Sequence, residues 1–365
     1  MNERRPLWDN PTLVWSALVL LWTAGLVRRM FFDFVPGDFT AYISAADVFV
    51  AGQNPYTEAR FATPRYDGFP YNYFPGTLFL IAPMAYLSTT VLVTADWVAR
   101  ACALVFVGRT LKRHIVPDMA THHLGVLMLL HEPLVIDQLV GNMVTYLIAA
   151  WALCLELSKR SGTLLDVLAA FLAGVVLSFK PFWLIPAGWV LVSRRCWSLT
   201  VALVLGVAST PLASLLLLDM IPAFRAHTQQ MREFYFSVDL LTLAPWALAV
   251  MVPASVVGAL LVWRRYPSEW VFLLGCVSVP IWPRVATYSY VITLPFSLYL
   301  IRRFGWGRGL ALSCVTLGPL PWLLRDAGVL PGEQLENWVM YIWCWCAALL
   351  CVWCLKRESE ETDAV

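Results

Sequence analysis

Apolar runs long enough to form membrane helices alternate with short polar turns along most of this chain. The first run, residues 13–26, follows Arg4 and Arg5 and is itself followed by Arg28 and Arg29. A cleaved signal peptide would show small residues after a short apolar core, and this run does not. We therefore expect a retained signal anchor with the amino terminus in the cytoplasm.

Basic pairs recur after every second apolar run and set the predicted topology. Because cytoplasmic loops of membrane proteins carry an excess of Lys and Arg, these turns are expected to lie in the cytoplasm. The intervening turns then lie outside, at residues 180–181, 219–241, 282–290 and 325–337. The basic pairs are Lys159-Arg160, Arg194-Arg195, Arg264-Arg265, Arg302-Arg303 and Lys356-Arg357.

The first part of the chain fits this pattern less simply. Basic residues at 109–113 predict a cytoplasmic turn, so residues 74–108 must cross the membrane once. That segment is longer than the roughly 20 apolar residues that span a bilayer, and Pro75 and Pro83 allow a bent or re-entrant start. An outward crossing at 121–138 and an inward crossing at 142–158 are expected to follow.

Composition agrees with a polytopic membrane protein. The 365 residues are 59% hydrophobic and 14% charged, whereas soluble domains carry about 25% charged residues. We predict a single all-α integral membrane domain over residues 1–365, with about 12 crossings and both termini cytoplasmic. The net charge of +2 is spread over short pairs without a basic patch, so nucleic acid is not an expected partner.

The nine cysteines lie in or beside apolar runs and predict no disulfide framework. Cys351 and Cys354 have a CxxC spacing, but no His or acidic ligand accompanies them, so no metal is expected there. No Gly-rich phosphate loop and no paired-Asp motif indicates a nucleotide-sugar domain. No cofactor is therefore expected.

The longest polar interruption, residues 33–73, is predicted to be the first extracytoplasmic loop. Within it, residues 38–51 have helical spacing with one apolar face, and Gly52-Gln53-Asn54-Pro55 ends the helix. At about fourteen residues this amphipathic helix is too short to cross, so we expect it to lie flat in the outer interface, opposite Arg194. Its apolar face comprises Phe39, Tyr42, Ile43, Ala46, Phe49 and Val50.

Four short motifs follow one another from this helix onward. They are Asp38-Phe39-x-x-Tyr42, Gly52-x-x-Pro55-Tyr56, Tyr71-x-Tyr73-x-Pro75-Gly76 and Ala82-Pro83. Their order resembles the first external loop of the polyprenol-phosphate-mannose-dependent α-mannosyltransferases, within the glycosyltransferase-C superfamily. The resemblance extends from about residue 38 to residue 295 and is weakest in the carboxy-terminal third.

The resemblance implies an inverting transfer of a hexose, with mannose expected, from a polyprenyl-phosphate donor. The acceptor would be lipid- or glycan-linked, and the reaction would take place on the extracytoplasmic face. The protein would lie in the cell membrane, expected to be the inner membrane of a bacterium. The donor, the acceptor and the bilayer are then its partners.

Asp38 has two interpretations. An Asp that follows Pro36-Gly37 at the start of a helix is a favoured N-cap. Sugar transfer requires a carboxylate that takes the proton from the acceptor hydroxyl, and the resemblance implies that Asp38 is this catalytic base. The two roles are compatible, one for each carboxylate oxygen. Asp47 is the weaker alternative and is expected on the solvated face of the helix.

Tyrosines and arginines of the same loop are candidate ligands for the sugars and the donor phosphate. Aromatic rings can pack the apolar face of a sugar while hydroxyls hydrogen-bond it, and interfacial anchoring is the alternative role. Arg60 and Arg65 oppose the charge rule, which favours contact with a phosphate, either of the donor or of lipid headgroups. The tyrosines assigned to the sugars are Tyr42, Tyr56, Tyr71 and Tyr73.

Two further outer cations are Lys180, before Pro181, and Arg284. Both are expected to converge with Arg60 or Arg65 on the donor phosphate, since outer cations contradict the charge rule. Snorkelling to headgroups is the alternative for Lys180.

Four more residues are assigned to the sugars or the acceptor. Glu132 is an ionisable residue in an apolar run, which makes it a functional candidate. Asn142 matches a Gly-Asn step of the family, and a polar cap at the start of a helix is its alternative role. Tyr288 and Tyr290 form the last outer cluster. The family often has a His near that cluster, and this chain does not, so no such role is transferred.

Two other classes of protein remain open. A transporter or flippase would gather its ionisable residues near the bilayer midplane on broken helices, whereas the polar residues singled out above gather at one face. A non-catalytic protein of envelope assembly would tolerate replacement of the loop charges.

Overall fold

Helix dominates the part of the chain that the structure describes, as the sequence predicts. The computed structural model describes residues 10–31, 37–57, 61–62, 67–68, 71–160, 162–180, 183–234, 267–278, 292–314, 343–344, 346–354 and 357. Strand is limited there to one antiparallel ladder of two residues per strand, β1 (Phe61–Ala62) with β2 (Asp67–Gly68).

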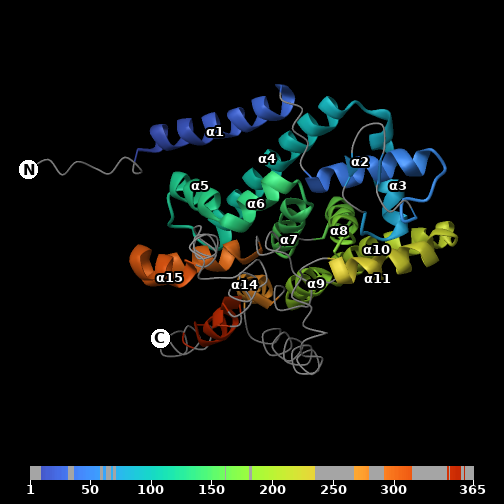
Figure 1. Cartoon of the computed structure of the whole chain (residues 1–365). Coiled ribbons are helices and arrows are strands. Elements are labelled where there is room, and N and C mark those ends of the chain that lie inside the picture. The colour runs from blue at the N-terminus through green and yellow to red at the C-terminus, as the bar shows by residue number, and fades with distance from the viewer. Residues whose placement is uncertain are drawn as a thin grey trace, which may run out of the picture.

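The helices are arranged as Figure 1 shows. In chain order they are α1 (Pro11–Phe31), α2 (Gly37–Val50), η2 (Pro75–Thr77), α3 (Leu78–Ile81), η3 (Ala82–Tyr86), α4 (Thr89–His114), α5 (Thr121–Leu130), α6 (Glu132–Val140), α7 (Val144–Leu157), α8 (Leu164–Leu177), α9 (Leu184–Ser193), α10 (Trp197–Ala213), η5 (Ser214–Leu217), α11 (Met220–Phe234), α14 (Ser268–Ser278) and α15 (Leu294–Ser313).

Two helical segments of the described part are long and apolar enough to cross a membrane. They are α4 and the continuous segment of α10 and η5, whereas apolar helices such as α7 and α8, with 14 residues each, are shorter than the roughly 20 residues of a span. Residues 74–108 therefore contain one candidate span, preceded by short helices that begin at Pro75. About 12 crossings are not confirmed.

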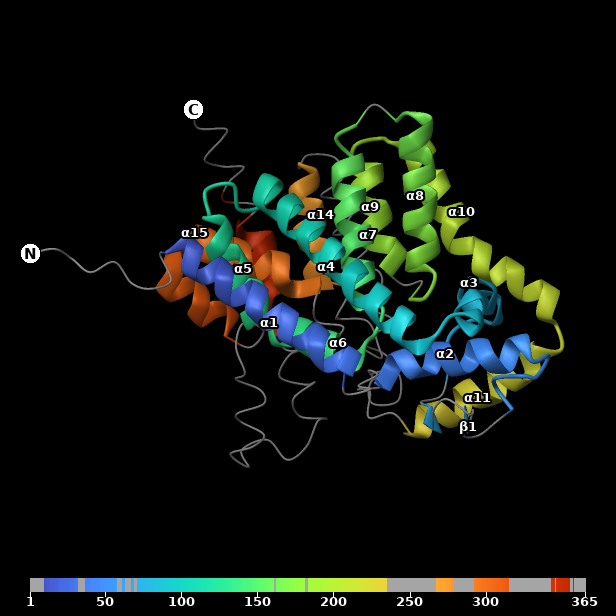
Figure 2. The same cartoon turned by 90° about the horizontal axis from the view of Figure 1, so that it is seen from above.

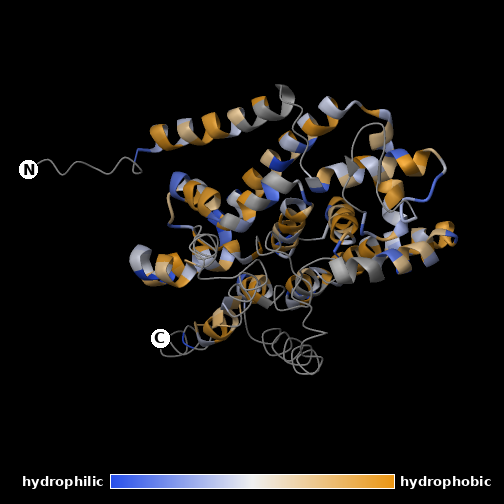
Figure 3. Ribbon diagram, in the orientation of Figure 1, coloured by the Kyte–Doolittle hydropathy of each residue, from blue (hydrophilic) through white to orange (hydrophobic). Residues whose placement is uncertain are grey.

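Exposed apolar side chains favour association with a membrane. Figure 3 shows apolar residues along α8 and α10, and large side chains of both helices are exposed there, among them Leu165, Leu172, Val201 and Leu212. Contiguous apolar surface of this kind marks contact with lipid or with another protein.

Helices α8 and α10 pack backbone against backbone through two glycines. A Cβ on Gly174 would lie 2.2 Å from the Leu203 carbonyl oxygen, and one on Gly206 would lie 2.1 Å from the Phe171 carbonyl oxygen. Small residues at membrane-helix contacts permit this close approach. Helix α7 lies against α4, α8 and α9, and its Trp151 is buried in the main apolar core.

One expected crossing is interrupted in the structure, and a second helix is broken close to an expected turn. The segment 121–138 forms two helices, α5 and α6, which are separated at His131 because Pro133 favours a new helix start. Helix α15 turns sharply at Gly305, whose φ of 77° suits glycine, and Gly309 then lies against the Ile301 backbone. The basic pair at 302–303 thus lies at a turn, as the charge pattern predicts.

The first loop packs as a second apolar core and does not form an isolated surface helix. Thr40 and Ser44, expected on a polar face of α2, are as buried as the apolar positions. Short helices η3 and α3, strand β2 and helix α6 surround α2, which explains why both its faces are covered. The predicted helix exists, but its predicted amphipathic character is wrong.

The loop lies at one end of the helices and the basic turns lie at the other. Helix α2 lies beyond the start of α7 and the end of α8 (Figure 2). It contacts Asn142, just before α7, and Phe179, just after α8. At the opposite end, Arg113 binds Glu156, Lys159 binds Glu269, and Arg302 donates to the Ile115 carbonyl. The first loop and these basic residues therefore lie at opposite ends of the described helices; residues 264–265 and 356 lie outside the described residues.

Candidate functional site

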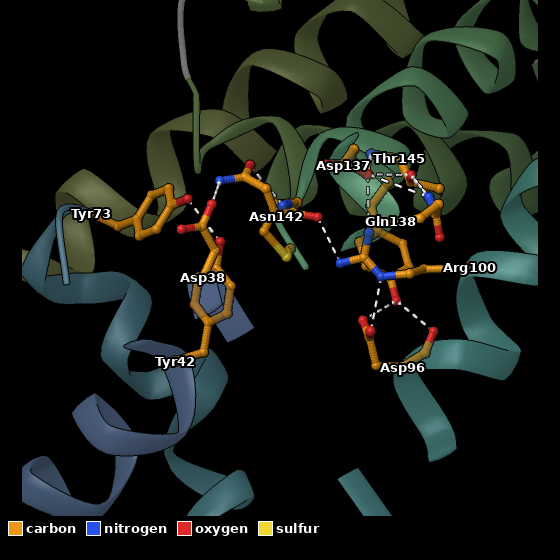
Figure 4. A network of polar contacts seen from close by, with 11 residues as sticks. Asp38, Tyr42, Tyr73, Asp96, Arg100, Asp137, Gln138, Asn142 and Thr145 are labelled. Carbon is orange, nitrogen blue, oxygen red and sulfur yellow. Dashed lines mark hydrogen bonds and ion pairs between the residues drawn. The ribbon is translucent and has the colours of Figure 1, made fainter. Parts of the chain in front are cut away.

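Asp38 lies in the first turn of α2, and its carboxylate faces another segment of the chain. The Asn142 amide donates a 2.7 Å hydrogen bond to Asp38 Oδ2 across 104 positions of sequence (Figure 4). The helix already begins at Gly37, so Asp38 is not its N-cap residue. A carboxylate in the first turn still complements the helix dipole.

The surroundings of Asp38 increase its basicity. Burial raises the pKa of the Asp38 carboxyl above its usual range, and the Asn142 hydrogen bond and the charges of Lys180 and Arg100 oppose that rise. A general base is most effective when its pKa approaches the working pH. The environment thus moves Asp38 in the direction that proton abstraction requires.

Asn142 is held by an arginine buried in α4. Arg100 Nη2 donates a 2.6 Å hydrogen bond to the Asn142 carbonyl, Nε binds Asp96 at 2.8 Å and Nη1 binds Asp137 at 3.0 Å (Figure 4). Asp137 also accepts from the Thr145 amide and hydroxyl. One network therefore joins α4, α6 and the start of α7 to the Asp38 carboxylate.

Sequence reasoning missed the centre of this network. Asp96 and Arg100 lie four residues apart in the apolar run that forms α4. Asp137 lies in the following apolar run, in the part that forms α6. Ionisable residues in such runs are functional candidates, and the i, i+4 spacing places two of them on one helix face. That signal is present in the sequence, and averaging hydropathy along each run hides it.

Lys180 reaches the same region from the end of α8. It lies in the turn that follows this helix, is partly buried, and interacts electrostatically with Asp137 and Asp38. Burial lowers the pKa of Lys180 to about 8, against the opposing effect of the two carboxylates. Lys180 and Asp38, predicted from separate motifs, therefore lie together.

The tyrosines of the first loop form one cluster. The Tyr42 and Tyr73 hydroxyls lie 2.7 Å apart beside Asp38, as Figure 4 shows. The Tyr56 hydroxyl donates to the Tyr73 carbonyl, and the Tyr71 hydroxyl pairs with Thr77. Tyr56 and Tyr71 are fully buried, so in this structure they hold the loop together, while Tyr73 is the more accessible of the four.

Several predicted ligands cannot be placed. Arg60, Arg65, Arg284, Tyr288 and Tyr290 lie outside the described residues, and so does the predicted convergence of the arginines on a phosphate. Residue 132 begins α6, but its side chain is not among those described.

Two buried histidines contact polar side chains that are distant in the sequence. The His131 ring lies 3.3 Å from the Thr293 hydroxyl, and the His227 ring pairs with Asn72 of the first loop at 2.8 Å. Within the described ranges, no three His, Cys, Asp or Glu side chains are grouped to hold a metal ion.

Comparison with protein-family models, with curated proteins and with solved structures finds no match to this chain.

Proposed function

We propose that this chain is a membrane glycosyltransferase that transfers a hexose, with mannose expected, from a polyprenyl-phosphate donor to a lipid- or glycan-linked acceptor. The observation that supports it most is the placement of Asp38, a partly buried carboxylate oriented by Asn142 beside the Lys180 ammonium group. A base and a cation of this kind are what an inverting transfer from a phosphate requires.

The proposed chemistry uses these groups in one displacement. Asp38 takes the proton from the acceptor hydroxyl as its oxygen attacks the anomeric carbon. The bond from that carbon to the donor phosphate oxygen breaks, and polyprenyl phosphate leaves with the bonding electrons. Lys180 stabilises the charge on the leaving phosphate, and Asp38 carries the proton away.

The tyrosine cluster would form the side of the site that binds the sugar. Tyr73 and Tyr42 place aromatic rings and hydroxyls beside the Asp38 carboxylate, an arrangement that suits a ligand with one apolar and one polar face. The bilayer would deliver the lipid-linked donor, on the side of the membrane opposite the basic turns.

A transporter is the second candidate, because one observation favours it. The Arg100 network is buried near the middle of a candidate span, and the adjacent segment is broken between α5 and α6. Buried charges and broken helices are typical of transport sites. The glycosyltransferase remains preferred because the network ends on Asp38, at the end of the helices.

The assay uses purified full-length protein, polyprenyl phosphomannose and a panel of lipid and glycan acceptors. Asp38→Asn retains an oxygen that accepts from Asn142 but removes the basic carboxylate. General base catalysis is typically worth about 10²–10⁴-fold, so this variant should transfer sugar at least a hundred times more slowly. Asp47→Asn, on the same helix, is the matched control and should retain activity.

Folded Asp38→Asn protein with near-normal turnover would contradict the assignment of the base. If the wild type transfers no sugar from polyprenyl phosphomannose to any acceptor but takes up solute into proteoliposomes, the transporter would be favoured.

A further inference from the structure

A cavity of about 490 Å³ lies at the end of the helices opposite Asp38. The carboxyl end of α4, the start of α14 and the turn of α15 enclose it, and its volume is in the range of small-molecule sites. The lining residues that bear on its chemistry are His114, Glu269, Trp270, Tyr299, Arg302 and Arg303.

The charges that line this cavity favour an anion. Arg302 and Arg303 both line the cavity, and the carboxylate of Glu269 is already paired with Lys159. Arg302 donates from Nη1 to the Ile115 carbonyl at 2.9 Å, which fixes the direction of its side chain. Its ion pair with Asp118, at 3.4 Å, is exposed to solvent and therefore contributes little.

The cavity also lies at the amino terminus of an eleven-residue helix. Pro267, just before α14, and Glu269 and Trp270 in its first turn line the cavity where the helix dipole is positive. The dipole and the two guanidinium groups therefore act in the same direction, toward a negatively charged ligand.

The remaining walls are apolar and aromatic. The Trp270 and Tyr299 rings meet edge to face with centroids 4.8 Å apart, and Ile115 and Leu273 complete the surface. A free inorganic anion would leave these walls without a partner, whereas an amphiphile would use both parts of the cavity.

We propose that this cavity binds the phosphate group of an anionic phospholipid, with the guanidinium groups on the phosphate oxygens and the aromatic walls on the glycerol and first methylenes. Arginine suits such a ligand because its planar donors match phosphate geometry. The site does not depend on glycosyl transfer, because it lies at the other end of the helices from Asp38. A soluble phosphate shares the headgroup chemistry and is the alternative source.

Native mass spectrometry of the full chain in detergent tests the proposal. Phosphatidylglycerol, phosphatidylcholine and inorganic phosphate are titrated separately. Wild type should bind phosphatidylglycerol about tenfold more tightly than phosphatidylcholine, because only the former has a net negative headgroup. The double variant R302Q/R303Q should lose this preference, while Arg308→Gln, an exposed arginine of the same helix, should keep it.

Titration of the wild type with the two lipids tests the proposal even if the double variant fails to fold. Equal binding of the two lipids would overturn the proposal. Binding of inorganic phosphate without binding of phosphatidylglycerol would show that the ligand is a soluble phosphate and not a phospholipid. A folded R302Q/R303Q protein that retains the full preference would overturn the assignment to this cavity.

Discussion

At the scale of single residues, the contacts of Arg100 constrain the molecule more than those of any residue that the sequence motifs identified. Its side chain is fully buried, and its donors reach Asp96, Asp137 and the Asn142 carbonyl from one helix. Two carboxylates and one guanidinium leave a net negative charge beside Asp38, which the Lys180 ammonium group offsets. The position and charge of the candidate base therefore depend in part on Asp96, Arg100 and Asp137, which contact no substrate in the proposed mechanism.

Replacing Arg100 should destabilise the protein strongly. Arg100→Ala would leave two buried carboxylates without their cation, and breaking a buried ion pair by removing one partner costs about 3–5 kcal/mol. Arg109→Ala, at an exposed position of the same helix, should change stability by less than about 0.5 kcal/mol. Unfolding of the two detergent-solubilised variants measures both changes in stability. Equal stability of the two variants would contradict the structural role of the network.

The pH dependence of transfer should report Asp38 and Lys180 together. The base acts when deprotonated, so kcat/KM should rise as pH increases through the raised pKa of Asp38. Lys180 assists when protonated, so kcat/KM should fall as pH increases through about 8. Lys180→Arg keeps its proton at high pH, and the alkaline fall should shift upward. A pH profile of this variant that matches wild type would remove Lys180 from the mechanism.

At the scale of elements, the contact between α8 and α10 depends on glycine. Gly174→Ala would place a methyl group against the Leu203 carbonyl and the Gly206 backbone, neither of which is a flexible side-chain end. Overpacking of this kind costs about 1–3 kcal/mol. In Gly188→Ala the new methyl group meets nothing within 4 Å, so the better helix propensity of alanine should stabilise α9 by up to about 1 kcal/mol.

Unfolding of the two variants in the same detergent tests this contact. Opposite shifts of stability are expected. Similar shifts for Gly174→Ala and Gly188→Ala would show that α8 and α10 do not approach each other as closely as the structure has them.

Helix α2 shows what a hydropathy pattern can and cannot predict. Its bounds follow from local signals, since helical spacing and Gly52 mark the helix and its end. Its environment depends on partners that are distant in sequence, and these cover Thr40 and Ser44. A single helix pattern gives the apolar face but does not reveal whether a second layer covers the polar one.

At the scale of the whole molecule, the sequence predicts the helical class and the two ends of the fold. The sequence also indicates that Asp38, Asn142 and Lys180 lie at the same end of the fold, because each is next to a turn assigned to the same side, and the structure has them close together. The number of membrane crossings is harder to predict from the sequence than the helical class. The break at His131 depends on local backbone geometry, and a sliding count of apolar residues does not register it.

The sidedness of the fold gives the last prediction. Gln53 is exposed in the first loop, and Arg194 is exposed at the end of α9. If the loop faces outward and the basic turns face the cytoplasm, Gln53→Cys should react with a membrane-impermeant maleimide in intact cells. Arg194→Cys should react only after the cells are permeabilised. Labelling of wild type gives the background from the nine native cysteines. Labelling of both variants in intact cells would contradict the separation of the two ends by a membrane, and with it an extracytoplasmic site at Asp38.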